Sequence, residues 1–172
     1  SPIRVYFSFN EKIYHNFDGS SAKNVEISFT PEKATYVLNF GEVSVKTELL
    51  TPVKGMRFIM RLSFINNTEK EMEISVLSVV YPYVNELMMA PWDKPEWYTN
   101  TKFDSENNYF LTTRYSVAGK KEERRYFTFV SDLMAKDYEL SSERLMEATN
   151  NFNYVPDKFS GLTEGEVYGF EQ

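Results

Sequence analysis

A strict alternation of apolar and polar residues is the feature that most limits how this chain can fold. Between residues 56 and 64 every second side chain is apolar, namely Met56, Phe58, Met60, Leu62 and Phe64. The positions between them hold Arg57, Arg61 and Ser63 together with Ile59. A period of two is the period of a β-strand, so one face of this segment is expected on a core and the other in water.

The same alternation recurs along most of the chain and predicts a mostly β protein. Further strands are expected at residues 3–9, 25–30, 36–40, 43–49, 72–80, 109–115 and 126–131. Gly41-Glu42 is expected to form a tight turn, and the polar run 66–69 is expected to close a hairpin between 56–64 and 72–80. A second hairpin is expected between 109–115 and 126–131. Because the strands follow one another without helices, an antiparallel β-sandwich covering residues 1–172 as a single domain is predicted.

Two segments interrupt this pattern. Residues 81–102 contain Pro82, Pro91 and Pro95 with both tryptophans, so they are not expected to form a regular central strand. Residues 142–150 are expected to form one short helix near the C-terminus, which Ser142 can cap. The tail from residue 156 is glycine-rich and has little periodicity, which suggests that the chain is an excerpt of a larger protein.

Composition excludes several classes of partner. The net charge of −6 and the lack of a basic stripe argue against a nucleic-acid partner. No apolar run approaches the roughly 20 residues of a membrane span, so no membrane partner is expected. The chain has no cysteine, which suits a cytoplasmic location and leaves no thiolate for metal binding or nucleophilic catalysis.

Signals for catalysis are weak. His15 is the only histidine and stands in a polar turn, which favours a structural role over a metal site or a catalytic triad. No glycine-rich nucleotide-binding loop is present, and no cofactor is expected. Asp93 and Glu96 could form the acid–base pair of a small hydrolase, but solvated loop charges are the simpler interpretation.

The most distinctive segment for binding is 90–102, where tryptophans stand among polar residues. Flat aromatic faces stack on the apolar faces of sugar rings, and polar side chains bind the hydroxyl groups. The candidate carbohydrate-binding residues are Trp92, Asp93, Glu96, Trp97, Tyr98, Asn100 and Lys102. The alternative is that these rings cover one end of the sandwich or dock on a neighbouring domain.

The order of features from Val43 onward resembles a known family. A strand at 43–52 ends in Leu50-Thr51-Pro52-Val53, and the next segment contains Phe64-Ile65-Asn66-Asn67-Thr68. Next come residues 73–83, an irregular loop and the strand Tyr126-Phe127-Thr128-Phe129-Val130-Ser131. After this strand come Asp137-Tyr138, Arg144-Leu145 and Phe159-Ser160-Gly161. This order resembles the N-terminal β-supersandwich of the glycoside hydrolase family 94 phosphorylases, formerly glycosyltransferase family 36, over about 120 of the 172 residues.

The resemblance implies a non-catalytic accessory domain. Family members cleave β-linked glucosides with inorganic phosphate and invert the anomeric centre, and their catalytic residues lie in a separate (α/α)6 barrel of the same chain. By this resemblance the partners are that barrel, an oligo- or polysaccharide and a second copy in a homodimer, and segment 81–102 is the loop that would reach the substrate site. An independent carbohydrate-binding module is the alternative function.

Overall fold

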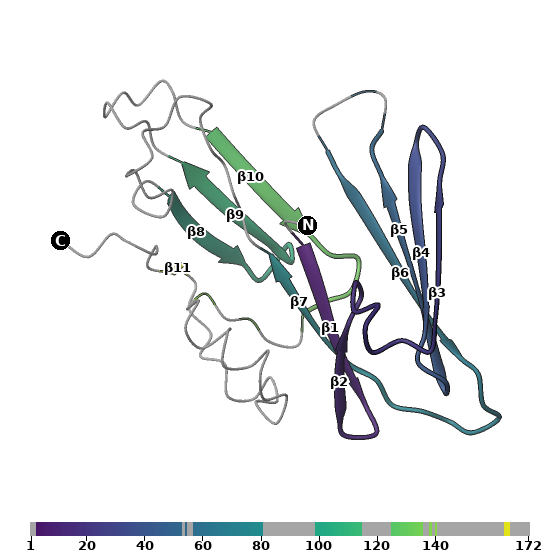
Figure 1. Cartoon of the computed structure of the whole chain (residues 1–172). Coiled ribbons are helices and arrows are strands. Elements are labelled where there is room, and N and C mark those ends of the chain that lie inside the picture. Colours follow the sequence, from purple (N-terminus) through teal and green to yellow (C-terminus); the bar gives the residue numbers. More distant parts are fainter. Residues whose placement is uncertain are drawn as a thin grey trace. The chain divides into compact units, whose positions relative to one another are not determined.

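The computed structural model describes residues 3–52, 54, 57–80, 99–114, 125–135, 138, 140 and 164–165 (Figure 1). These residues contain no helix and form eleven strands in three sheets. The strands are β1 (Ile3–Phe9), β2 (Lys12–His15), β3 (Asn24–Phe29), β4 (Lys33–Asn39), β5 (Val43–Leu50), β6 (Ile59–Asn66), β7 (Ser75–Val80), β8 (Thr99–Asp104), β9 (Tyr109–Arg114), β10 (Arg125–Val130) and β11 (Glu164–Gly165). The mostly β, antiparallel class predicted from the alternation is therefore confirmed.

The chain divides into two compact units, one formed by residues 3–79 and the other by residues 80–172. The first unit holds a three-stranded sheet in the order β2-β1-β7 and a four-stranded sheet in the order β3-β4-β5-β6. The second holds a four-stranded sheet in the order β10-β9-β8-β11. That residues 1–172 form a single domain stays a prediction.

The four-stranded sheet of the first unit is a meander whose turns match their sequences. Gly41 has a φ of 99°, which glycine adopts without steric cost. In the same turn, Asn39 Oδ1 accepts a hydrogen bond from Gly41 N at 2.7 Å, and Phe40 N donates to Val43 O at 2.8 Å. These contacts set the register that pairs Leu38 with Val45.

The β1–β2 hairpin turns on Asn10 and Glu11, whose φ values are 49° and 62°. Two successive residues with positive φ are typical of the two-residue turn that matches strand twist. The Asn10 side-chain amide donates to the Glu42 carboxylate, which ties this turn to the turn between β4 and β5. Sequence reasoning missed β2, because its four residues stand too close to the polar turn to show alternation.

The two sheets of the first unit enclose one aromatic core, which makes this unit a two-layer sandwich. The buried residues of this core are Phe7, Phe9, Leu38, Phe40, Val43 and Val45. Phe7 is fully buried on β1, and its ring lies 5.5 Å from Phe40 and 5.3 Å from Phe64 of the opposite sheet. Both contacts are edge-to-face, an arrangement that adds about 0.5–1.5 kcal/mol per pair to the gain from burial.

Asn16 joins the two sheets through hydrogen bonds inside this core. It follows β2 and is fully buried. Its Oδ1 accepts from Val5 N at 3.0 Å, and its own N donates to Val5 O at 2.9 Å. Its carbonyl oxygen accepts from Thr47 Oγ1 of the opposite sheet at 3.4 Å. The polar groups of a fully buried asparagine are thereby satisfied from both layers.

The predicted hairpin between residues 56–64 and 72–80 is wrong. β6 pairs with β5, whereas β7 pairs with β1 in the other sheet. The connection between β6 and β7 crosses from one layer to the other, and Met72 and Ile74 of this connection pack against the core. The alternation also changes phase here, because Val79 is buried in β7 while Val76 is exposed. A short polar turn can connect two paired strands of one sheet or two strands of different sheets. Only the contacts of the flanking residues with the core decide which connection forms.

The second unit is built on the β8–β9–β10 meander. The predicted hairpin between 109–115 and 126–131 is confirmed, with β9 and β10 paired from Tyr109↔Val130 to Arg114↔Arg125. On one face of the sheet, Phe103 lies 4.6 Å from Phe110 and 4.1 Å from Tyr138 between ring centroids. Residues 99–102, expected in an irregular loop, instead begin β8. The prolines that argued against a strand all precede residue 96, so nothing prevents pairing after that point.

The glycine-rich tail contributes a short strand, because β11 pairs with Lys102 and Thr101 of β8. The short helix expected at residues 142–150 lies outside the described residues.

Replacing Asn16 by alanine should lower the free energy of unfolding by about 1–3 kcal/mol, because the Val5 amide would lose its acceptor in a buried site. Urea unfolding followed by circular dichroism measures this change. Asn24→Ala is the matched control, since Asn24 is exposed and surface substitutions usually stay within about 0.5 kcal/mol. Equal stabilities for the two variants would show that the Asn16 hydrogen bonds do not hold the sandwich.

Candidate functional site

Of the seven candidate carbohydrate-binding residues, Trp92, Asp93, Glu96, Trp97 and Tyr98 lie outside the described residues. Asn100 and Lys102 lie in β8, two positions apart and therefore on one face of the strand. The structure thus places the described end of the candidate segment on a sheet rather than on a loop.

The face of the sheet that carries Lys102 is the wet face of β8, β9 and β10. Residues directly opposite each other in paired strands share a face. The pairing therefore places together Lys102, Asp104, Tyr109, Leu111, Thr113, Tyr126, Thr128 and Val130, which we call the tyrosine face. Tyr126 and Val130 are 62% and 63% exposed, so this face combines aromatic rings with hydroxyl and charged groups in solvent.

A shallow hollow of about 260 Å³ opens at one end of the tyrosine face. It is lined by Lys102, Phe103, Asp104, Tyr109 and Leu111. Tyr109 contributes an aromatic ring to this lining, and Lys102 and Asp104 contribute charged residues. Its volume is below the roughly 300–1,000 Å³ of typical small-molecule pockets, and its lining combines two aromatic rings with two charged residues.

The Asp104 carboxylate is held in place by the β8–β9 turn. Its Oδ1 accepts from Glu106 N at 3.0 Å and Asn107 N at 2.9 Å, and its Oδ2 accepts from Asn107 Nδ2 at 3.0 Å. These hydrogen bonds, with those from Asn107 the strongest, lower the pKa of Asp104. The Tyr109 hydroxyl also donates to Asp104, which raises the pKa of Tyr109. At neutral pH the hollow therefore presents a carboxylate and a protonated phenol, a hydrogen-bonding pair and not an activated nucleophile.

Asn108 fixes the same turn to the segment after β10. It has a φ of 55°, a conformation that asparagine tolerates better than most residues. Its side chain donates to Ser131 O at 3.1 Å and Leu133 O at 2.8 Å and accepts from Ala135 N at 2.9 Å. These three hydrogen bonds tie the β8–β9 turn to residues 131–135.

His15 has the structural role that the sequence favoured. It ends β2, its Nδ1 accepts from Phe17 N at 3.1 Å, and its ring packs edge-on against Tyr6 at 5.7 Å. Burial lowers the pKa of His15, so the neutral ring that accepts this hydrogen bond is favoured. Among the described residues, no three His, Cys, Asp or Glu side chains cluster as metal ligands do.

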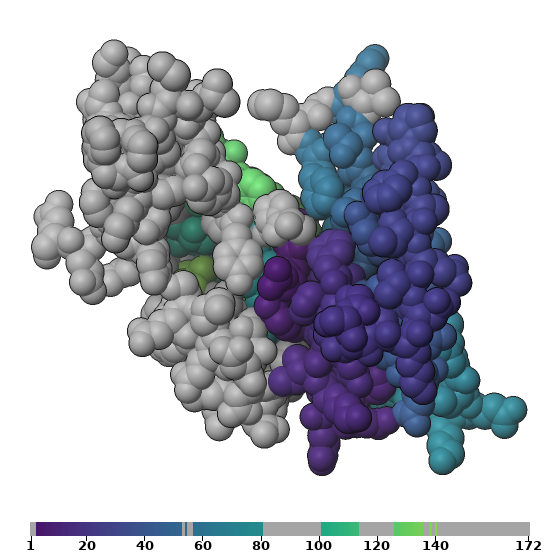
Figure 2. All heavy atoms as spheres, in the orientation of Figure 1, coloured from purple at the N-terminus to yellow at the C-terminus, as the bar shows by residue number. Residues whose placement is uncertain are grey.

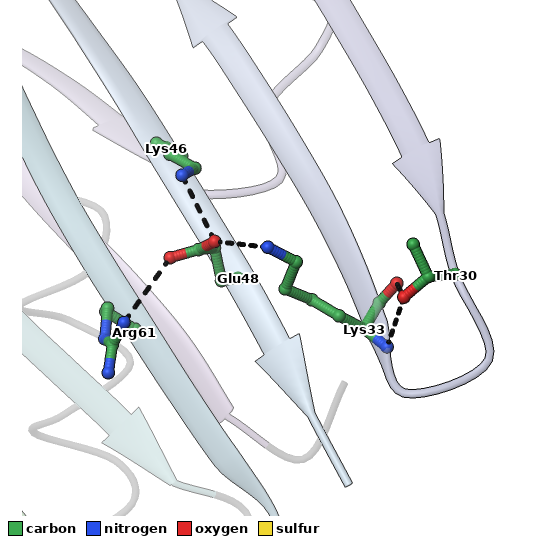
Figure 3. A network of polar contacts seen from close by, with 5 residues as sticks. All are labelled: Thr30, Lys33, Lys46, Glu48 and Arg61. Atoms are coloured by element: carbon green, nitrogen blue, oxygen red, sulfur yellow. Dashed lines mark hydrogen bonds and ion pairs between the residues drawn. The ribbon is translucent and has the colours of Figure 1, made fainter.

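The wet face of the four-stranded sheet of the first unit carries a network of charges around Glu48 (Figure 3). Glu48 Oε1 lies 2.9 Å from Lys33 Nζ and 3.1 Å from Lys46 Nζ, and Oε2 lies 3.9 Å from an Arg61 nitrogen. The hydrogen bonds from the two lysines lower the pKa of Glu48. The carboxylate pairs with cations from three adjacent strands, so this network links the strands and its role is structural.

No protein-family model, curated protein or solved structure matches this chain. In the part of the chain that the structure describes, no helix is long and apolar enough to cross a membrane. The site is therefore defined by its own geometry. Sequence reasoning selected Lys102 but missed Tyr109 and Tyr126, although their alternation with Phe110 and Phe127 could have placed them on the wet face.

The Glu48 network makes stability depend on pH with a defined sign. The carboxylate has a lower pKa in the folded chain than the usual 4.5, so its contribution is complete above that value and is lost as pH falls through the folded pKa. Glu48→Gln should therefore be less stable than the wild type at pH 7, and the difference should shrink toward pH 3. Urea unfolding of both proteins across this range measures it. A difference that is constant with pH would contradict the ionic origin of the network.

Proposed function

We propose that this chain is a non-catalytic accessory sandwich domain of a glycoside phosphorylase-like carbohydrate-active enzyme, in which it supports a separate (α/α)6 barrel. One observation carries the proposal: residues 3–80 form a two-layer antiparallel sandwich in which β5, β6 and β7 occupy the segments on which the family resemblance rests. β10 likewise coincides with the strand 126–131 of that resemblance. The agreement concerns strand order and position and not a shared catalytic motif.

The described polar groups fit an accessory role. Glu48 is engaged by Lys33 and Lys46, and Asp104 is engaged by its own turn. Both carboxylates are ionised by these contacts, as their lowered pKa values indicate, so neither suits the general acid of glycosidic cleavage.

The test is an activity comparison between this chain and the product of the complete reading frame that encodes it. Each protein is incubated with β-linked glucobioses and inorganic phosphate, and the released sugar phosphate is measured with its anomeric configuration. We expect the complete product to release the inverted, α-linked sugar 1-phosphate and the 172-residue chain to release none. A complete reading frame that encodes no helical barrel would overturn the proposal.

A second candidate function, an independent carbohydrate-binding module, is favoured by the tyrosine face. Tyr126 is exposed and Tyr109 lines the hollow, and both lie on the same rigid sheet as Lys102 and Asp104. Sheets hold binding groups more precisely than loops do. Tyr126 stands opposite Thr113, four residues along β9 from Tyr109, so a glycan chain lying along the strands would meet two rings and several hydrogen-bonding groups.

Truncation of the two tyrosines separates this candidate from the first. If the tyrosine face binds glycans, Tyr109→Ala and Tyr126→Ala should each weaken binding of β-glucan oligosaccharides at least about tenfold, since aromatic anchors dominate such contacts. Isothermal titration calorimetry measures the affinity. Leu133→Ala is the control, because Leu133 is 73% exposed and lies outside the tyrosine face.

The same titration tests the tryptophan segment. Binding that is lost only in Trp92→Ala or Trp97→Ala would move the binding site to residues 90–98. If the wild-type chain binds no β-glucan at millimolar ligand, the binding-module function is excluded and the accessory function stands alone.

A further inference from the structure

The strand β3 is an unprotected sheet edge with an apolar face. It ends the order β3-β4-β5-β6, and no described strand lies beyond it. Figures 1 and 2 show β3 at the outer margin of the four-stranded sheet of the first unit. All six of its residues are exposed. Val25, Ile27 and Phe29 are 40%, 53% and 69% exposed and share the face that elsewhere in the sheet covers the core.

Hydrogen bonding at the end of β3 shows which backbone groups face outward. Thr30 and Lys33 bond to each other, with Thr30 N to Lys33 O at 2.8 Å and Lys33 N to Thr30 O at 3.3 Å. In an antiparallel pair the bonded residues alternate, so the even-numbered residues of β3 bond to β4. The amide and carbonyl groups of Val25, Ile27 and Phe29 therefore point away from β4. The three apolar residues are the ones whose backbone is free to accept a further strand.

Natural edges are usually protected by lysine, proline or a bulge. β3 contains neither lysine nor proline, and its single charged residue is Glu26 on the wet face. Val25, Ile27 and Phe29 would therefore offer an adjoining strand both hydrogen bonds and an apolar face.

We propose that β3 pairs with β3 of a second copy of this chain, antiparallel and centred on Ile27, and so joins the two four-stranded sheets into one. An antiparallel pair of identical strands has two-fold symmetry, which gives a closed dimer and not an open filament. Ile27 lies opposite Ile27 of the second copy, and Val25 lies opposite Phe29. The family resemblance also implies a homodimer, but the interface and register proposed here rest only on the geometry of the β3 edge.

The charges and the apolar side chains of β3 favour the register centred on Ile27 over the registers shifted by one residue. Centring the pair on Glu26 would place the two Glu26 carboxylates directly opposite each other, which is destabilising. Centring it on Ser28 would place Val25 opposite Pro31, which has no amide to donate. The Ile27 register places Glu26 opposite Ser28, and it alone uses all three apolar residues of both copies.

The contact is small, so the dimer is expected to be weak. One strand pair buries less than the roughly 1,200 Å² of a standard interface, and we expect a dissociation constant of about 1 µM to 1 mM. Sedimentation velocity of the 172-residue chain up to about 1 mM, or 20 mg/mL for a chain of 20.2 kDa, covers this range.

Charge substitutions at Ser28 test the register. Ser28→Lys places an ammonium group opposite Glu26 twice in each dimer and should tighten the dissociation constant, whereas Ser28→Glu should weaken it, by roughly 2- to 30-fold in each direction. Exchanging the charges in Glu26→Lys with Ser28→Glu should restore tight association. Ser28 is exposed on the wet face, so folding is not at risk.

Cysteine substitution gives a second measurement, because the chain has no cysteine of its own. Opposed residues that share two hydrogen bonds have Cα atoms about 5.5 Å apart, within the range of a disulfide. Ile27→Cys should therefore form a disulfide-linked dimer under mild oxidation. Phe29→Cys should not, because in this register its counterpart lies four residues away along the strand, at about 14 Å.

A chain that is monomeric at about 1 mM, or a dimer whose affinity is the same in all the Ser28 variants, would overturn the proposal. A monomer would leave the β3 edge to a strand from another protein or from the rest of the parent chain. Equal cross-linking of Ile27→Cys and Phe29→Cys would exclude the Ile27 register.

Discussion

The contact between Phe7 and the opposite sheet organises the first unit. Phe7 is fully buried on β1 and reaches Phe40, in the turn between β4 and β5, and Phe64 on β6 of the other layer. Since side chains of a strand alternate between faces, a shift of one residue in β1 would expose Phe7 and bury Tyr6. The register of the three-stranded sheet and its position over the four-stranded sheet therefore depend on this aromatic contact, which the hydrogen bonds of Asn16 reinforce.

The wet faces differ in what they offer to a ligand. On the first unit, Lys33, Lys46 and Arg61 converge on Glu48, so the charges satisfy one another. On the second unit, Tyr109 and Tyr126 stand among hydroxyl and charged groups on a sheet whose other face is packed. Paired opposite charges stabilise the folded surface and need no ligand. Exposed aromatic rings, by contrast, leave apolar area in water, and a flat ligand that covers them is bound favourably. This difference is why the tyrosine face, and not the Glu48 network, is the better candidate for glycan binding.

Local patterns predicted much of this architecture. The alternation of Val43 and Val45 with Ser44 and Lys46 placed β5 and its buried face correctly, and Gly41 marked the turn before it. The candidate site was predicted less well. Lys102 was found through its nearness to the tryptophans, but Tyr109 and Tyr126 are 17 residues apart in sequence and share a face of the sheet only through strand pairing. The role of Asn108 likewise depends on contacts with residues 131–135, and the local sequence does not predict these contacts.

Taken by itself, the sequence determined that this chain forms strands, where most of them lie, and which side chains of β5 and β6 face a core. The reason is that apolar residues at every second position come to lie on one face only when the backbone is extended. Only the tertiary structure decided which strands are neighbours. β6 and β7 follow each other around a polar turn, yet they lie in different sheets because Met72 and Ile74 are drawn into the core between the layers. Strand pairing depends on burial summed over distant segments, and the same short turn is compatible with either outcome. The open edge of β3 is also a property of that arrangement, since an edge exists only once the order of the strands is set.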